Sequence, residues 1–406
     1  STTYVSAQEG TSSPYSFYGI GDVKFKGTND LRQMGGMAVA GDSVHLNLLN
    51  PASYAKLRLT SFAVGGTGNF NNLSNSSSKE KAQRFSLDYL AVGLPMGKLG
   101  FSFGLMPYTN VGYRTRSEVV TTENTKYNNY KGDGGINRAF IGAGYNVTKN
   151  LSIGAEYQYN FGDIATESIV FMPNIILGTR EQNNSNIKGN SFNFGAFFTK
   201  DIGTKYFINS SLTYSPEAKY TSINSRNIVT VSVTSNGSFI EDVNPLVVYV
   251  NDSKLIVPKK YSFGTGFGEK NKWFIGAEYT FQENSNLGNR FDDIVNASFE
   301  NSQKYTVGGF YIPKYNSFSK YLDRVTYRAG FRYENTGLVI NNTPINDYGM
   351  NFGLGLPVGG RLTSMNVGFE LGKRGTTSNN LIQENYFNFT IGLSINDLWF
   401  IKRKYD

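Results

Sequence analysis

Apolar and polar side chains alternate along most of the chain, which is the pattern of β-strands with two different faces. In the clearest segment, LSIGAEYQYNF at 151–161, every odd position is apolar or aromatic, and the even positions carry Ser, Gly, Glu, Gln and Asn. Fourteen segments follow this period and predict fourteen strands. They are 59–65, 85–93, 99–105, 139–147, 151–161, 192–198, 206–214, 261–267, 273–281, 305–311, 325–333, 348–356, 365–371 and 387–395.

The connections between these segments are alternately short and long. The short ones are 95–98, 148–150, 200–204, 268–271 and 358–360, and the long ones are 71–82, 117–136, 166–189, 221–257, 283–303 and 372–381. Two connections break the alternation, a longer turn at 314–322 and a short loop at 337–344. Outer-membrane barrels have short periplasmic turns and long outer loops. The pattern therefore predicts an all-β fold, a transmembrane antiparallel β-barrel of about 14 strands in the cell outer membrane of a Gram-negative bacterium.

Composition agrees with a surface that faces lipid. Aromatic residues make up 15% of the 406 residues and charged residues 17%, below the roughly 25% usual in soluble domains. A soluble propeller or a pair of sandwiches would also show short alternating strands. A propeller should repeat a blade signature about every 40 residues, and the chain has none.

The residue types exclude much chemistry. The chain has no Cys and a single histidine, His45, which excludes thiol nucleophiles and any site with two imidazoles. We therefore expect no enzyme activity, no catalytic residue, no cofactor and no metal. The formal charge is +8, but Lys and Arg are scattered. This favours contact with outer-membrane lipid and lipopolysaccharide and does not indicate nucleic acid.

Residues 1–58 lack the alternation and form a separate N-terminal segment ahead of the barrel at 59–395. Residues 1–7 end in Val-Ser-Ala, which is typical of a signal-peptide remnant. In the run MGGMAVAGDSVHLNLLNPAS at 34–53, small residues let backbone lie close to a wall, and Pro51 turns the chain into the first strand. The motif residues are Gly35, Gly36, Asp42, Asn50, Pro51 and Ala52. Asn50-Pro51-Ala52 alone would also suit a plain turn that enters a strand.

These residues resemble the N-terminal hatch of the FadL family of outer-membrane proteins. The Ser-Pro-Tyr-Ser start at 13–16 and the Trp-Phe-Ile-Lys-Arg-Lys-Tyr end at 399–405 resemble Bacteroidetes-type members of that family. The resemblance implies a hatch inside a barrel of fourteen strands. It also implies a lateral gate at a kink in the third strand, where Pro107 cannot donate a ladder hydrogen bond. An ordinary bulge near the rim would explain Pro107 equally well.

Charged residues occupy inward positions of the alternation. They are Arg138, Glu156, Glu278, Arg324, Arg328, Arg332 and Glu370. Charges enclosed by a barrel usually pair with one another, so we expect them to anchor the hatch, with a pathway for a charged substrate as the alternative. Arg324, Arg328 and Arg332 are four residues apart and would lie on one face of a single strand.

Two further segments suggest contacts outside the barrel. Residues 221–257 predict an outer β-hairpin with a turn near Asn236-Gly237, which would be a lid or a docking surface. Residues 396–406 form a C-terminal tail, aromatic and basic, that suits the periplasmic interface.

Three functions are compatible with these features. The favoured one is passive transport of a hydrophobic ligand, such as a long-chain fatty acid, across the outer membrane. The alternative is a non-transporting barrel subunit of an outer-membrane secretion or barrel-assembly complex, which docks other outer-membrane proteins or lipoproteins through residues 221–257. A membrane-embedded hydrolase would need His45 as its base, and a residue within the hatch is a poor candidate.

Overall fold

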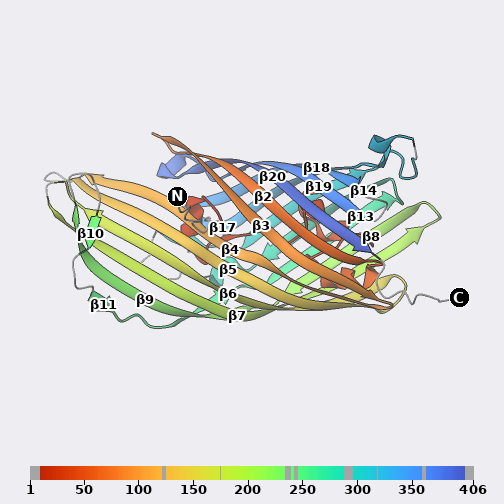
Figure 1. The fold of residues 1–406 in the computed structure, drawn as a ribbon, viewed down its shortest axis with the longest axis horizontal. Coiled ribbons are helices and arrows are strands. Elements are labelled where there is room, and N and C mark those ends of the chain that lie inside the picture. Colours follow the sequence, from red (N-terminus) through yellow and green to blue (C-terminus); the bar gives the residue numbers. More distant parts are fainter. Residues whose placement is uncertain are drawn as a thin grey trace, which may run out of the picture.

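The predicted strands form one antiparallel sheet that closes on itself in the computed structural model (Figure 1). The structure describes residues 10–120, 125–173, 175–233, 239–241, 246–287, 296–317, 319–358 and 363–397. Closure comes from β2 (Thr60–Ser74) and β20 (Gln383–Asp397), which pair from Thr60↔Asp397 to Ser74↔Gln383. The predicted fold class is confirmed. No helix among the described residues has the length and apolar character to cross a membrane.

Fourteen strands make up the described wall, two of them interrupted. Between β2 and β20 lie β3 (Lys79–Met96), β4 (Leu99–Val120), β5 (Thr125–Asn146), β6 (Leu151–Phe171), β7 (Leu177–Ile202), β8 (Tyr206–Ser215) continued by β9 (Ala218–Val233), β12 (Ser253–Val257) continued by β13 (Lys260–Glu269), β14 (Trp273–Gln282), β16 (Ser302–Tyr311), β17 (Thr326–Ile340), β18 (Thr343–Val358) and β19 (Thr363–Arg374). The short strands are β1 (Asp22–Val23), β10 (Phe239–Glu241), β11 (Leu246–Val248) and β15 (Ala297–Phe299). The helical turns are α1 (Asn29–Arg32) and the 3₁₀ helices η1 (Pro14–Phe17), η2 (Ala38–Ala40), η3 (Pro51–Lys56), η4 (Asn284–Asn286), η5 (Tyr321–Arg324) and η6 (Ser378–Asn380).

The wall is much taller on one side than on the other. Strands β4 to β7 have 21 to 26 residues, whereas β13, β14 and β16 have 10 each. The prediction of long loops at 117–136 and 166–189 was wrong, because most of these residues continue the strands. Beyond the membrane the outward face of a strand no longer meets lipid, so the ladder continues without the outward apolar residues that mark a strand in the sequence.

The predicted outer hairpin at 221–257 contains several short strands. β9 pairs antiparallel with β10, from Phe239↔Val233, and then with β11 and β12. Residues 236 and 237, where the turn was expected, lie outside the described residues.

Two belts of aromatic side chains mark the membrane on the low side. In the outer belt, Tyr279, Tyr305, Tyr333 and Tyr348 lie side by side on four successive strands, with neighbouring ring centroids 5.1, 6.3 and 5.1 Å apart. In the other belt, near the end that carries the short turns, Phe267 lies between Tyr206 and Trp273. Such belts, flanking a band of outward apolar residues, are typical of outer-membrane barrels. The expected location in a Gram-negative outer membrane agrees with this surface.

The described part of the N-terminal segment, residues 10–58, lies within the barrel, where wall glycines let its backbone approach. Gly100, Gly144, Gly154 and Gly195 are cross-strand neighbours on β4, β5, β6 and β7. A side chain added to any of them would come closer than 3.0 Å to backbone or side-chain atoms of residues 50–55, in and just before η3. These four residues form what we call the glycine row. It fixes where η3 meets the wall.

A similar arrangement holds α1 on the opposite wall. Gly308 and Gly330, paired on β16 and β17, lie against the backbone of Met34 and Gly35. Gly353 and Gly368, paired on β18 and β19, lie against the side chain of Gln33. The N-terminal segment therefore bridges the lumen between two walls that both contain paired glycines at the contact.

Replacing Gly154 by Val tests the glycine row. Valine is a good strand residue, but its side chain would overlap Pro51 and Ala52, so we expect the free energy of unfolding to fall by about 1–3 kcal/mol and the N-terminal segment to become sensitive to protease. The matched control is Ala155→Val, which adds two carbons at the neighbouring, outward position. Urea unfolding of the refolded barrel in detergent measures both. Equal stability of the two variants would contradict the proposed fit.

Candidate functional site

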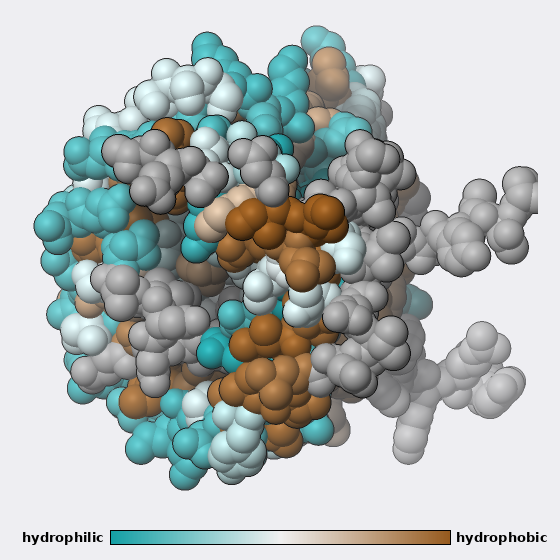
Figure 2. Space-filling model, turned by 90° about the vertical axis from the view of Figure 1, so that its left-hand side faces the viewer, coloured by the Kyte–Doolittle hydropathy of each residue, from teal (hydrophilic) through white to brown (hydrophobic). Residues whose placement is uncertain are grey.

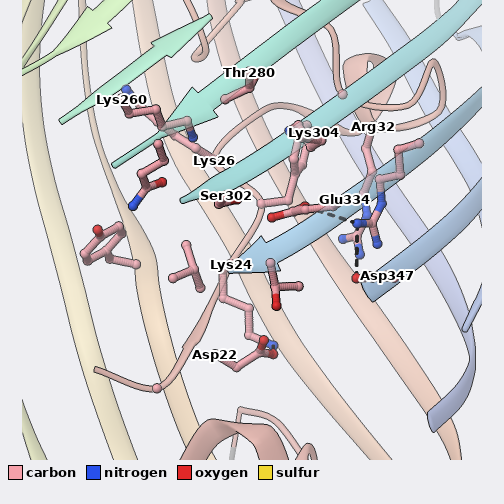
Figure 3. Close-up of a pocket in the computed structure, with 18 of the residues that line it drawn as sticks. Asp22, Lys24, Lys26, Arg32, Lys260, Thr280, Ser302, Lys304, Glu334 and Asp347 are labelled. Carbon is pink, nitrogen blue, oxygen red and sulfur yellow. Dashed lines mark hydrogen bonds and ion pairs between the residues drawn. The ribbon is translucent and has the colours of Figure 1, made fainter. Parts of the chain in front are cut away.

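The main cavity lies between the N-terminal segment and the wall. Its volume is about 430 Å³, and most of the side chains that line it are polar or charged. Figure 3 shows Asp22, Lys24 and Lys26 of the N-terminal segment facing wall residues such as Lys260 and Lys304 across this space. We call it the lumen cavity.

A carboxylate on β19 joins the N-terminal segment to the wall. One oxygen of Glu370 accepts from Arg32 of α1 at 2.9 Å, and the other accepts from Arg332 of β17 at 2.9 Å. Arg332 also pairs with Asp347 at 3.2 Å, and Arg32 lies 3.7 Å from Asp88 of β3. Four strands and α1 thus share one ion-pair network within the barrel, where water screens charges weakly.

The other predicted lumen acids also hold the N-terminal segment. Glu156 accepts from Lys26 Nζ at 2.6 Å and from the Tyr54 hydroxyl at 2.6 Å. Glu278 accepts from the backbone N–H groups of Ala38 and Val39, at 2.8 and 3.3 Å.

The arginines divide into those that reach the N-terminal segment and those that do not. Arg328 donates to Gln33, the residue that follows α1, at 3.1 Å and to Asn366 at 2.7 Å. Arg138 instead donates to Asn160 at 2.8 Å and stacks on Tyr108, with its guanidinium carbon 3.8 Å from the ring centroid.

The expectation for Arg324 was wrong. Strand β17 begins at Thr326, so Arg324 is the last residue of η5 in the turn before it, and the predicted row of three arginines on one strand has only two members. The backbone N–H of Val325 bonds back to Leu322, which closes the turn before the ladder begins. The Arg324 guanidinium lies over the Tyr321 ring at 5.5 Å.

The motif residues of the N-terminal segment lie at its contacts with the wall. Gly35 and Gly36 both have positive φ, 78° and 86°, and Gly35 lies against Thr306. The Asn50 side chain accepts from Ala52 N–H and donates to Ser211 Oγ at 2.9 Å. Pro51 occupies the first turn of η3, where a missing N–H costs nothing.

Asp42 and His45 form a polar chain with the wall. Asp42 Oδ2 lies 2.7 Å from His45 Nδ1, and His45 Nε2 lies 2.9 Å from Ser364 Oγ of β19. Burial by itself would lower the pKa of His45, but the Asp42 carboxylate raises it above its ordinary value. None of these three residues lines the lumen cavity. This series of polar contacts, Asp42–His45–Ser364, connects the N-terminal segment to β19.

The wall is open on one side of the lumen. β3 pairs with β4 only from Leu90 to Met96, although β3 begins at Lys79 and β4 runs on to Val120. The register of β4 against β5 shifts between Pro107 and Thr109, so Pro107 marks a bulge at the start of this opening. β1 covers part of the β4 edge by pairing at Thr109 and Asn110. Figure 1 shows the outer ends of β3 and β4 diverging. We call this opening the β3–β4 seam.

Apolar side chains inside the tall wall are covered. Val111, Ile136, Ile164 and Ile187 are at most 1% exposed and form a cluster with Ile20 of the N-terminal segment. The surface available in the lumen is therefore mainly that of the lumen cavity, where polar and apolar surface are present in similar amounts.

Sequence reasoning missed several residues of the cavity. Asp22, Lys24, Lys26 and Arg32 belong to a segment with no strand period, so nothing in the sequence indicated which wall they would face. The inward position of Lys260 and Lys304 could have been predicted from the sequence. Each precedes an outward tyrosine, and side chains alternate between the two faces of a strand. Among the described residues, no group of three or more His, Asp or Glu could hold a metal ion.

The comparisons with known proteins agree with this geometry. The sequence model of the BamG family matches residues 1–406. The chain belongs to the BamG family. No curated protein matches its sequence.

Solved structures show that this member of the BamG family has the FadL-like fold. The toluene transporter TbuX of Ralstonia pickettii has a TM-score of 0.63 at 13% identity, over 92% of this chain and 99% of that one. The Pseudomonas putida toluene transporter TodX gives 0.59 at 13% identity, over 92% and 100%. A Pseudomonas aeruginosa FadL homologue gives 0.58 at 13%, over 92% and 98%. At 13% identity, this similarity shows a shared fold.

Replacing His45 by Gln tests the contact with β19. A raised folded-state pKa means that protonated His45 stabilises the fold below about pH 6.5, and that this contribution is lost as pH rises through the raised value. We expect the variant to lose about 0.5–1 kcal/mol at pH 5, a small value because Asp42 is half exposed, and less at pH 9. Thermal unfolding in detergent at pH 5, 7 and 9 measures the difference. A pH-independent loss in His45→Gln would contradict the assignment.

Proposed function

We propose that this BamG-family barrel is a subunit of an outer-membrane complex and docks a partner protein through its outer end. The observation that carries the proposal is an apolar surface at that end. Its residues are Val119 and Val120 of β4, Ile176 and Leu177 at the start of β7, and Leu246 and Val247 of β11, all between 47% and 74% exposed. We call this surface the crest. Figure 2 shows apolar side chains gathered at this end of the molecule.

The crest stands far from the lipid. Leu177 precedes the outward aromatic Phe192 by 15 residues on β7, and at about 3.3 Å per residue this is about 50 Å along the tilted strand. The apolar band of an outer-membrane barrel is only about 25 Å tall. Apolar side chains at the crest therefore face water in the isolated chain. Burying them against a partner recovers hydrophobic free energy, which is why such patches mark interaction sites.

The contacts of the N-terminal segment inside the lumen favour a subunit of a complex over a solitary transporter. Glu156, Glu278, Arg328 and Glu370 all bind the N-terminal segment, so displacing this segment would leave several charges unpaired within the barrel. The cavity that remains is lined by charged and polar side chains together with apolar ones, so its lining does not by itself favour a hydrophobic molecule. We therefore assign the N-terminal segment the role of a fixed plug. Membership of the BamG family supports the barrel-assembly form of the complex.

The test is purification from native membranes with the crest altered. We expect wild-type protein to bring stoichiometric partners in mild detergent, and the triple variant Ile176→Ser, Leu177→Asn, Val247→Asn to lose them. The altered side chains are exposed, so the barrel should keep its heat-modifiable migration on gels. The matched control is Leu322→Ser with Ile202→Ser, which removes exposed apolar side chains at the opposite end. Retention of all partners by the crest variant, or a wild-type protein that purifies alone, would contradict the proposal.

Transport of a hydrophobic compound is a second candidate, favoured by the β3–β4 seam. Residues of both seam edges line the lumen cavity, namely Ser86 and Asp88 of β3 and Tyr108 of β4. In this candidate, Pro107 and its bulge would open a lateral gate for compounds such as long-chain fatty acids.

Replacing Pro107 by Val tests the gate. Valine restores a ladder donor and favours regular pairing, so a gating role predicts at least a several-fold loss of hydrophobe uptake with the barrel intact. Uptake of a radiolabelled fatty acid by cells that express wild type, the variant or no barrel is the measurement. Uptake that is equal with and without the wild-type barrel would exclude transport of that compound.

A further inference from the structure

We propose that the lumen cavity binds a phosphate group between Lys260 and Lys304. This site is independent of the docking function proposed above. The two lysines come from neighbouring parts of the low wall, Lys260 at the start of β13 and Lys304 on β16, with β14 between them. Both line the cavity, and Figure 3 shows them on the wall opposite Lys24, with Lys26 nearby.

The register brings the lysines over a common patch of hydroxyl groups. Gln282 of β14 faces Lys260, and Thr280, two residues away, faces Lys304. The Thr280 and Ser262 hydroxyls lie 2.8 Å apart, and Ser302 also lines the cavity at this level. Two long, flexible lysine side chains whose strands are separated by one other strand can reach the same small anion. The hydroxyl groups would lie beneath that anion.

The acids that face the cavity already have partners. Asp22 pairs with Arg374 at 2.8 Å, and Asp88 lies 3.7 Å from Arg32. The network of Arg332 takes up three more carboxylates, which are Glu334 at 3.6 Å, Asp347 at 3.2 Å and Glu370 at 2.9 Å.

Two acids remain, and they bind the N-terminal segment. Glu278 accepts the backbone N–H groups of Ala38 and Val39, and Glu384 accepts from the Ser13 hydroxyl. Glu334 lies opposite Lys304 in the ladder but pairs with Arg332. Within the described residues, no acid comes within ion-pair distance of Lys260 or Lys304. Two ammonium groups therefore line one cavity without a carboxylate bound to either, an arrangement that an anion would stabilise.

The donor set suits phosphate. Lysine ammonium groups are compact point charges that bind phosphate, whereas the flat fork of arginine fits both carboxylate and phosphate. Arg32 and Arg332 lie in the same cavity but are already saturated by Glu370 and its neighbours. Two lysines with hydroxyl donors match a tetrahedral dianion.

The phosphate could come from two sources. A free phosphate or small phosphate ester would enter from the outer end. A phosphorylated lipid headgroup of the outer leaflet would enter through the β3–β4 seam, because the cavity lining includes residues of both seam edges, such as Ser86 and Tyr108. The chemistry recognised is the same, and experiment separates the two.

The first arm uses radiolabelled inorganic phosphate and equilibrium dialysis of the purified full chain in detergent. We expect one phosphate per barrel, with affinity reduced about tenfold or more in Lys260→Gln/Lys304→Gln. The control Lys98→Gln/Lys149→Gln removes the same charge from two exposed turns and should bind as wild type does. Lys260→Arg/Lys304→Arg should retain most of the binding, which separates loss of charge from loss of packing.

The second arm places the same proteins in nanodiscs with and without lipid A and detects retained lipid A by native mass spectrometry. Phosphate binding in detergent supports a free anion; lipid A retained by wild type and lost from Lys260→Gln/Lys304→Gln supports the headgroup. Absence of binding in both arms, or equal binding by the glutamine variant, would overturn the site. Partner retention by the glutamine variant is expected to be normal, so failure of this site and failure of the docking proposal give different results.

Discussion

The structure depends on the close approach of one polypeptide segment to the inside of a barrel that surrounds it. At the glycine row, η3 meets the wall backbone to backbone, because Gly100, Gly144, Gly154 and Gly195 leave no side chain between them. Paired glycines on the other wall do the same for α1. A segment with so little regular structure of its own has few internal hydrogen bonds, so the wall must supply partners for its polar groups.

The charged residues inside the barrel meet this need for polar partners. Inward carboxylates such as Glu156, Glu278 and Glu370 accept hydrogen bonds from the N-terminal segment, and Arg32 and Lys26 enter the lumen to meet them. The apolar side chains of the tall wall close over Ile20, which leaves the lumen cavity as the main accessible surface of the interior. A barrel with the same fold as hydrocarbon channels thus has an interior crossed by ion pairs to its N-terminal segment.

The unequal height of the wall separates the possible functions in space. The low side, from β8 to β18, carries the aromatic belts and the two lysines of the proposed phosphate site. The tall side, β4 to β7 with β9, lifts the crest well above the lipid. Between β20 and the tall side, the β3–β4 seam breaks the ladder, and β1 partly fills it. Docking, anion binding and lateral access therefore involve different parts of one sheet.

The sequence by itself determined the barrel, its fourteen strands and the inward position of most lumen charges, because lipid on one side and lumen on the other impose a period of two. It did not show how far β4 to β7 extend, since above the membrane that period no longer reports a strand. The inward position predicted for Arg324 was wrong for a related reason. The alternation of inward and outward side chains can be extrapolated past the end of a strand, and only the turn at η5 shows where β17 begins. The partners of Glu370 and His45, the seam at Pro107 and the unpaired lysines were decided by tertiary structure, because they depend on which wall an aperiodic segment meets.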